Sequence, residues 1–398
     1  MKKIIFIANV DCGEGMSGGK RIYFEFLRNW KKNFNIYFFG SVGTILQIKQ
    51  HLKKNIKFIE TDTKDHPNLY SVHGLFIHYL RRLIFGINSI KKNGPIINQA
   101  DYIYSVSDFY PDFVPALYAK LKNPKIKWIA AYYLFASSPF ANDSPYKGKN
   151  WLRGFLYWLM QRPSYWLVNK YADFVFVTSE PDVIKFITKK RDRSKIIVVQ
   201  GGVDITESEK YLKSVNIISL DKRKYDACFV GRFHYQKGVL VLIDIWKKVC
   251  NKKKSAKLVM IGNGSLEHEV RQKIKKYSLE NSIDLLGFKD GREKYDVFKQ
   301  SKMILHPATY DSGGMAAAEG MAWGLPGVSF NLEALKTYYP KGMIKTNEGD
   351  IEGFAKNIIN LLDDKILYQK IAEDARNLII EVWDWNKRAN IIFNLIGK

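Results

Sequence analysis

The chain contains few cysteines: Cys12, Cys228 and Cys250 are the three among 398 residues. They are odd in number and far apart, and none has a neighbour at the spacing of a metal site. Disulfide-built secreted proteins and zinc modules need more closely spaced cysteines. Both classes are excluded, and we expect a protein of a reducing compartment, the cytoplasm.

Long uninterrupted apolar segments are also missing. At the N-terminus a short apolar run ends before Asp11 and Glu14, and no cleavage site of small residues follows. A first β-strand is therefore a better interpretation than a signal peptide. Residues 151–168 are apolar almost throughout, but two arginines and Pro163 interrupt them. That interruption argues against a membrane-spanning helix.

Acidic residues are scarce: 39 Asp and Glu stand against 63 Lys and Arg, for a net charge of +24. Residues 1–200 hold 31 Lys and Arg against 14 acids, a net charge of +17, whereas residues 201–398 carry +7. Such a basic half indicates an anionic partner: a membrane surface, nucleic acid or a phosphorylated acceptor. A lysine-rich genome is the alternative, but it should affect both halves alike.

The remaining composition is that of a folded protein, with 46% hydrophobic residues and a length sufficient for two or three domains. Short apolar runs alternate with helical segments, which predicts doubly wound parallel sheets. The second half repeats this alternation from Tyr225 onward. In the first half we expect strands at Lys3–Ala8, Asn35–Phe39, Ile56–Glu60, Tyr102–Val106, Ile126–Tyr132 and Phe174–Thr178.

The most informative segment is Met303–Phe330, which predicts a strand, a loop, a helix of small residues and a second strand. Two acids, Asp311 and Glu319, stand eight apart, and Gly313 and Gly314 expose backbone N–H groups at the helix start. A helix N-terminus can hold a phosphate or a hydroxyl, and the two carboxylates can accept hydrogen bonds from sugar hydroxyls. The loop residues expected nearest to this ligand are Ser312, Gly313, Gly314 and Met315.

A second motif precedes it. Tyr225–Gly231 predicts a buried strand, and Arg232 and Lys237 follow where the strand gives way to a helix. Two fixed cations there can neutralise the charge of a leaving diphosphate. Two further predicted strands, within 256–264 and 283–288, end in glycine turns.

The two motifs together resemble the donor site of family 4 glycosyltransferases. Asp311-x7-Glu319 is followed by Gly-Met-Ala-x-Gly-x-Pro, where the family usually has Glu-x7-Glu, and Arg232 and Lys237 match the family's diphosphate-binding pair. The resemblance implies the GT-B fold: two Rossmann-like domains facing across a cleft. It also implies retaining, metal-independent transfer of a hexose from a nucleoside-diphosphate sugar to a glycan or lipid-linked acceptor. In the resemblance the base is held near Gly262, Gly264 and Phe288.

The same resemblance divides the chain into three parts. Residues 1–200 are the expected acceptor-binding domain, residues 201–381 the donor-binding domain, and residues 382–398 a helix that returns to the first domain. The predicted joint lies at Val199–Thr206, whose Gly-Val-Asp resembles the family's Asn-Gly-Val-Asp, with Gly201 in place of the Asn.

The first domain departs from the family. Its G-x-G-x-x-G at residues 13–18 does not indicate nicotinamide binding, because it starts several residues after the strand and no acid ends the second strand. In the resemblance Gly18 and Gly19 approach the diphosphate. Members of the family usually have a histidine at the end of the fourth or fifth strand, where it contacts the transferred sugar. Residues 127–135 of this chain contain no histidine. Tyr132 or Tyr133 is the candidate for its position, with strand packing as the alternative.

Three interpretations stay open from the sequence. A nucleotide-sugar epimerase, or a GT-B module that binds without catalysis, would carry the same donor motifs. Nucleic-acid binding is a weaker interpretation, since the sequence contains no identifiable recognition module.

The apolar, basic and aromatic segments 74–92 and 151–168 suit either a bilayer interface or an inter-helix core. Docking would place the protein at the inner face of the membrane.

Overall fold

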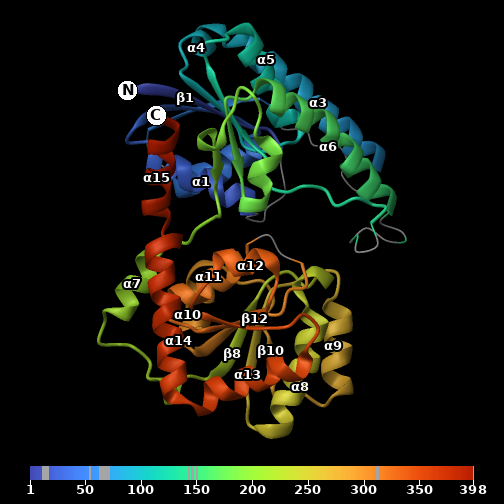
Figure 1. Ribbon diagram of the computed structural model, residues 1–398, viewed down its shortest axis with the longest axis vertical. Coiled ribbons are helices and arrows are strands. Elements are labelled where there is room, and N and C mark those ends of the chain that lie inside the picture. The colour runs from blue at the N-terminus through green and yellow to red at the C-terminus, as the bar shows by residue number, and fades with distance from the viewer. Residues whose placement is uncertain are drawn as a thin grey trace. The chain divides into compact units, whose positions relative to one another are not determined.

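The computed structural model describes residues 1–10, 18–52, 55–61, 72–141, 144, 148, 151–310 and 313–397. The chain divides into two compact units: unit 1 is residues 1–200 with 389–398, and unit 2 is residues 201–388. Each unit is built around one parallel β-sheet flanked by helices (Figure 1). The expectation of two Rossmann-like, doubly wound domains is confirmed.

Unit 1 has a seven-stranded sheet in the order β3-β2-β1-β4-β5-β6-β7. The innermost strands are buried on both faces, which explains their near-continuous apolar sequences. The strands are β1 (Lys2–Ala8), β2 (Phe34–Gly40), β3 (Ile56–Glu60), β4 (Tyr102–Ser105), β5 (Lys127–Ala131), β6 (Phe174–Val177) and β7 (Ile196–Val198).

Helices cover both faces of this sheet. They are α1 (Gly18–Trp30), α2 (Val42–His51), α3 (Val72–Lys92), α4 (Gly94–Asn98), α5 (Tyr110–Lys122), α6 (Trp151–Tyr171), the 3₁₀ segments η2 (Glu180–Phe186) and η3 (Arg193–Lys195), and the end of α15 (Trp385–Gly397). α6 continues through Pro163, where the sequence suggested an interruption. In the described part of the chain, no helix combines the length and the apolar character that crossing a membrane requires.

The C-terminal helix completes the core of unit 1. Trp30 Nε1 donates to Ala389 O at 2.8 Å, and the Tyr102 hydroxyl donates to Ile396 O at 3.0 Å. The ring of Phe393 meets Phe34 edge to face at 5.2 Å. The expected return of the tail to the first domain is therefore confirmed.

This tail is not one helix from Val382, as the sequence suggested. A π-helix, η6 (Ile379–Trp383), comes first, and Asp384 then adopts an extended conformation before α15 begins. Asp384 interrupts the helix because its backbone pairs with Val203, near the start of unit 2. The units divide after Arg388, within α15, rather than at Val382.

Unit 2 has a six-stranded sheet in the order β10-β9-β8-β11-β12-β13. Its strands are β8 (Tyr225–Val230), β9 (Leu258–Ile261), β10 (Ile283–Leu285), β11 (Ser301–His306), β12 (Gly327–Phe330) and β13 (Met343–Thr346). Its helical segments are α7 (Thr206–Leu212), η4 (Leu220–Lys222), η5 (Tyr235–Lys237), α8 (Val239–Lys252), α9 (Glu267–Lys276), α10 (Gly291–Lys299), α11 (Met315–Ala322), α12 (Glu333–Tyr338), α13 (Ile351–Asp363), α14 (Lys365–Leu378) and η6.

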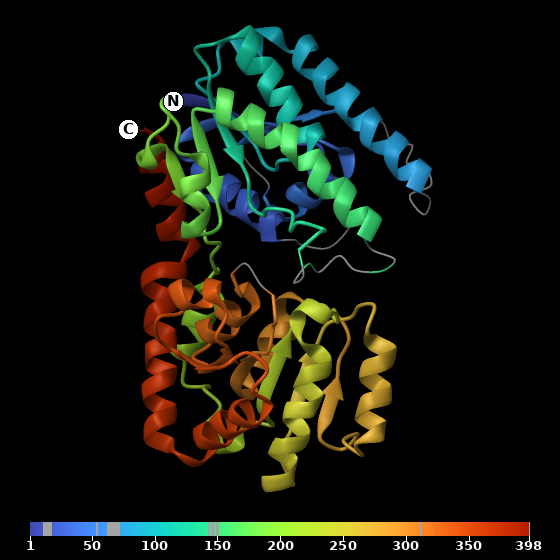
Figure 2. The ribbon, with the colours of Figure 1, turned by 45° about the vertical axis from the view of Figure 1, so that its right-hand side comes forward.

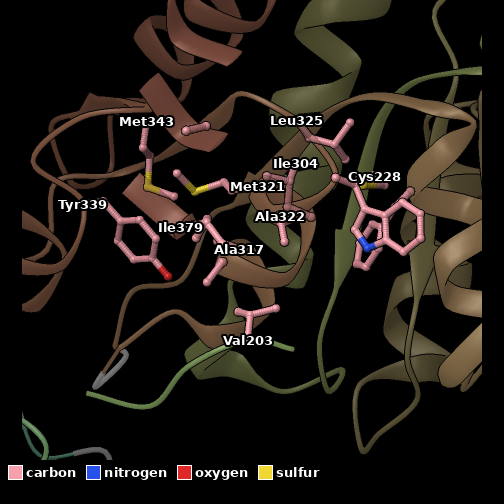
Figure 3. Packing of buried hydrophobic residues seen from close by; sticks show 14 of the residues in the cluster. Val203, Cys228, Ile304, Ala317, Met321, Ala322, Leu325, Tyr339, Met343 and Ile379 are labelled. Carbon is pink, nitrogen blue, oxygen red and sulfur yellow. The ribbon is translucent and has the colours of Figure 1, made fainter. Parts of the chain in front are cut away.

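Alternate side chains of these strands feed two separate cores. α8, α9 and α13 pack on one face of the sheet, and α10, α11, α12 and α14 pack on the other. Figure 3 shows the second core, where Cys228 and Ile304 from the sheet meet Ala317 and Met321 from α11. Small residues along α11 let this helix lie close to the sheet, and a Cβ on Gly320 would touch Ile304.

We expect Ile396→Asp to destabilise unit 1, because Ile396, on α15, is fully buried. A buried unpaired carboxylate that replaces an isoleucine should cost about 3–5 kcal/mol of unfolding free energy. Ile391 lies on the same helix but is exposed, so Ile391→Asp should leave stability nearly unchanged. Thermal unfolding followed by circular dichroism compares the two, and equal melting temperatures would contradict the packing described for α15.

Candidate functional site

The candidate site of unit 2 is formed by the loops that follow the carboxyl ends of its strands. The strand order reverses between β8 and β11, so the chain leaves these neighbouring strands toward opposite faces of the sheet. Ligands of open parallel sheets bind in the crevice that forms at such a switch point. The loop after β8 carries Arg232 and Lys237, and the loop after β11 leads into α11.

Backbone hydrogen bonds join four of these loops. Thr309 N, after β11, donates to Gln236 O, after β8, at 3.1 Å. Phe233 N donates to Asn263 O, after β9, at 2.8 Å, and Gly262 N donates to Gly287 O, after β10, at 2.9 Å. The loops after β8, β9, β10 and β11 are therefore connected through their backbones, and we call the surface that they form the floor of the candidate site.

Glycines make this close approach possible. Gly238 has φ +65°, and a Cβ there would overlap the carbonyl of Pro307. Gly262 has φ +144°, and a Cβ there would overlap the carbonyl of Gly231. Both positions need the left-handed half of conformational space and the missing side chain together.

Arg232 precedes the short 3₁₀ turn η5 and Lys237 is its last residue, with His234 between them in the sequence. Burial lowers the pKa of His234, and the positive charges of Arg232 and Lys237 lower it further. The His234 ring accepts a hydrogen bond from Gln236 N at 3.4 Å, which caps the turn. Arg232 and Lys237 are thus close enough to His234 to disfavour a positive charge on its ring. The same two positive charges would favour an anion bound beside them.

The Tyr339 hydroxyl contacts the backbone at the start of α11. Gly314 caps the helix with φ +58°. The Tyr339 hydroxyl lies 3.1 Å from Gly313 O and 2.7 Å from Gly314 O, within reach of both carbonyls. This fixes the turn that precedes Met315 and its backbone N–H groups. Asp311 and Ser312 lie outside the described residues.

Glu319 is paired with a lysine that no motif suggested. Lys294 Nζ, on α10, lies 3.0 Å from Glu319 Oε2 and 2.7 Å from Asp290 Oδ1. The side chains of Lys294 and Glu319 are both nearly buried, so their attraction is poorly screened by water. The pair fixes the Glu319 carboxylate one to two turns inside α11.

A family model for glycosyl transferases group 1 matches residues 212–378, which include all of these loops. The fold of the whole chain is that of HepE from Anabaena, in a crystal structure with UDP and glucose: the TM-score is 0.70 with 15% identity, and both chains are covered completely. Residues 212–378 are a group 1 glycosyltransferase domain, and the whole chain has the GT-B fold. Membership of family 4 in particular stays a prediction.

Two curated relatives agree with this assignment. An uncharacterized glycosyltransferase, MJ1069, of Methanocaldococcus jannaschii is 24% identical over 89% of this chain and 88% of its own length. The amylovoran biosynthesis glycosyltransferase AmsD of Erwinia amylovora is 34% identical over 34% of this chain and 38% of its own.

The base-binding candidates of the glycosyltransferase lie at the edge of this floor. Phe288, after β10, is 65% exposed and is therefore not a core residue. A Cβ on Gly264 would lie 2.5 Å from Phe233 O, so Gly264 brings the loop after β9 against the loop after β8. An exposed aromatic ring next to close-packed backbone suits stacking on a base.

In unit 1 the structure separates two neighbouring tyrosines. Tyr133 is half-buried, its hydroxyl is 2.5 Å from that of Tyr104, and its ring lies 3.4 Å from the Cβ position of Gly19. Gly18 and Gly19 are the first residues of α1. Tyr132 is buried among Phe135, Tyr165 and Phe186. The prediction of a ligand contact is therefore wrong for Tyr132, whose side chain points into the core.

Lys294 and Tyr339 escaped the sequence analysis for a physical reason. Both come from outside the loop motifs, and both act through tertiary contacts that sequence spacing does not reveal. The only signal for Lys294 is Asp290 four residues before it, a pattern that helix surfaces often show.

We expect Gly262→Ala to disrupt the floor of the glycosyltransferase, because the new Cβ would overlap the backbone of residue 231. The variant should lose nucleotide binding along with stability. Gly287→Ala is the matched control, because its φ is +68° but its Cβ would touch nothing. It should cost only the left-handed strain of about 1–2 kcal/mol. Isothermal titration with UDP and thermal unfolding separate the two, and equal effects would contradict the close approach.

Proposed function

We propose that this glycosyltransferase moves a hexose from a nucleoside-diphosphate sugar to a glycan or lipid-linked acceptor, with retention of configuration and without a metal ion. One observation carries the proposal: at the switch point of unit 2, the loop that holds Arg232 and Lys237 is hydrogen-bonded to the loop that leads into α11, where Lys294 pairs with Glu319. HepE, whose fold matches this chain, was crystallised with UDP and with UDP-glucose, which supports a uridine nucleotide as donor.

Each part of the floor then has a role. Arg232 and Lys237 bind the diphosphate, together with the backbone N–H groups at the start of α11. Glu319, held by Lys294, accepts hydrogen bonds from hydroxyls of the same ligand, and Asp311 is the candidate for a second set of hydroxyls. Phe288 and the backbone around Gly262 and Gly264 hold the base.

The chemistry follows from these charges. The bond between the anomeric carbon and the diphosphate oxygen breaks as negative charge grows on that oxygen, and fixed cations stabilise such charge. The acceptor oxygen forms the new bond on the same face of the sugar. The leaving diphosphate oxygen takes the acceptor's proton, so no side-chain nucleophile is needed. Arg232, Lys237 and the α11 N-terminus supply the positive charge that a metal would otherwise provide.

We also propose that the enzyme works in the cytoplasm, at the inner face of the membrane when its acceptor is lipid-linked. AmsD, a partial relative, is named for amylovoran biosynthesis, which supports a glycan product. The strongly basic unit 1 supports an anionic surface or a phosphorylated acceptor as its partner.

A panel of nucleotides and nucleotide sugars tests the donor. The true donor should raise the melting temperature most, since a ligand at about 100 times its Kd adds about 2.7 kcal/mol to the stability of the folded state.

Arg232→Ala and Lys237→Ala should each weaken UDP binding about tenfold to a hundredfold, as expected for a lost charge-assisted hydrogen bond. Lys254 is exposed before β9, at the opposite end of the sheet, so Lys254→Ala should bind normally.

The outcomes separate the alternatives. Release of a changed nucleotide sugar without any acceptor would identify an epimerase. Binding with no turnover on any acceptor would identify a non-catalytic module. If no nucleotide shifts the melting temperature, or if the three variants bind alike, the proposed donor site is wrong.

His234 gives a second test that depends on pH. Its pKa is lowered in the free protein by burial and by the two neighbouring cations. A bound diphosphate would offset those cations and raise this pKa, so UDP affinity should increase as the pH falls through the titration of His234. Histidine NMR titrations with and without UDP, assigned with His234→Gln, measure the change. An unchanged titration would place the diphosphate elsewhere.

A further inference from the structure

α6 exposes apolar side chains and buries polar ones. Gln161 and Ser164 are buried, and the Gln161 side chain is bonded to Asp108 Oδ2 at 2.8 Å and Leu134 O at 2.7 Å. The opposite face repeats large apolar residues every three or four positions, which places them on one side of the helix. Those with exposed fractions between 45% and 59% are Leu152, Leu156, Leu159 and Trp166.

α3 shows the same inversion. His78, Arg82 and Ser89 are buried, and Arg82 Nε donates to His78 Nε2 at 2.6 Å. Toward solvent the helix presents apolar side chains with exposed fractions of 40% to 54%: Ile77, Leu80 and Ile84. A helix in contact with water alone should have the reverse arrangement, because exposing this apolar area is unfavourable.

The two helices are neighbours in unit 1. α5 packs against both, and Tyr110 at its start connects them. Tyr110 N donates to the Tyr79 hydroxyl of α3 at 2.9 Å, and the Tyr110 hydroxyl donates to Met160 O of α6 at 2.9 Å. In Figure 2 α3 and α6 extend from the sheet in the same direction.

An exposed aromatic cluster extends the apolar face at the start of α6. The rings of Trp151 and Phe155 stack at 5.3 Å. Phe140, which is 65% exposed, meets both rings edge to face. Tryptophan and phenylalanine at such exposed positions are typical of the membrane–water interface.

Charge identifies what this face binds. Besides the buried Arg82, α3 and α6 together hold six Lys and Arg residues and no Asp or Glu. Two of the cations lie over tryptophan rings: the Arg162 guanidinium is 4.2 Å from the ring centroid of the half-buried Trp158, and Lys170 Nζ is 4.8 Å from that of the exposed Trp166. The cores of protein–protein interfaces are depleted in charge, whereas apolar side chains mixed with cations match the boundary of an anionic bilayer.

We propose that the exposed faces of α3 and α6, with the Phe140–Trp151–Phe155 cluster, form a docking surface for an anionic lipid bilayer. Leucine, isoleucine and tryptophan side chains enter the acyl boundary, and the basic side chains reach the headgroups. The inference rests on the proposed function only in that docking would bring unit 1 to a lipid-linked acceptor. The surface and its binding stand without it.

Co-sedimentation of the full chain with vesicles tests the docking surface. We expect binding to phosphatidylcholine vesicles that contain phosphatidylglycerol, little binding to phosphatidylcholine alone, and release by high salt. Leu156→Glu on α6 and Ile84→Glu on α3 should each reduce the partition coefficient at least about fivefold, the effect of about one headgroup-facing charge. Ile366→Glu, at a residue 81% exposed on α14 in unit 2, makes the same charge change and should bind like the parent.

Several results would overturn the proposal: no sedimentation of the parent, equal binding to neutral vesicles, or the same loss in all three variants. Light scattering gives a further check. A dimer in solution that Leu156→Glu dissociates would assign this face to a second copy of the chain instead. UDP binding, measured on the same variants, should be unchanged, so a failure here is distinguishable from a failure of the donor site.

Discussion

Contact between backbones at the carboxyl ends of the unit 2 strands is the constraint on which the candidate site depends. The carbonyls of Gly231 and Pro307 occupy the space where side chains of residues 262 and 238 would stand. Because these loops touch directly, the backbone that carries Arg232, Lys237 and the α11 N-terminus is held in place by hydrogen bonds between the loops. The loops therefore need no rearrangement when a ligand binds, which lowers the entropy lost on binding.

The carboxylate in this site is also fixed in advance. Lys294 reaches Glu319 from a different helix, and both side chains are nearly excluded from solvent. A buried ion pair of this kind contributes little net stability, but removing one partner leaves an uncompensated charge. Its use here is positional, because it commits the Glu319 carboxylate to one orientation.

Much of the fold could be predicted from the sequence, because inner strands of parallel sheets are short apolar runs that end in glycine or polar turns. The strand that sequence analysis did not predict, β13, lies at a sheet edge. Edge strands carry a weaker apolar signal, and Lys345 within β13 breaks it further. The loop motifs gave Arg232, Lys237 and Glu319, but Lys294 and Tyr339 reach the site only through packing. The inverted faces of α3 and α6 were equally hidden, since a helix apolar almost all round has no face that periodicity can identify.

The terminal helix has a consequence for synthesis. The core of unit 1 is made by residues 1–200 and closed by residues 389–398, with all of unit 2 between them. During translation, the side chains of Trp30, Phe34 and Tyr102 are synthesised long before their partners on α15, which is made last. Unit 2, in contrast, is complete as soon as Arg388 has emerged from the ribosome. Unit 2 is thus free to reach its final form first, and the segment translated earliest is the last to close its core.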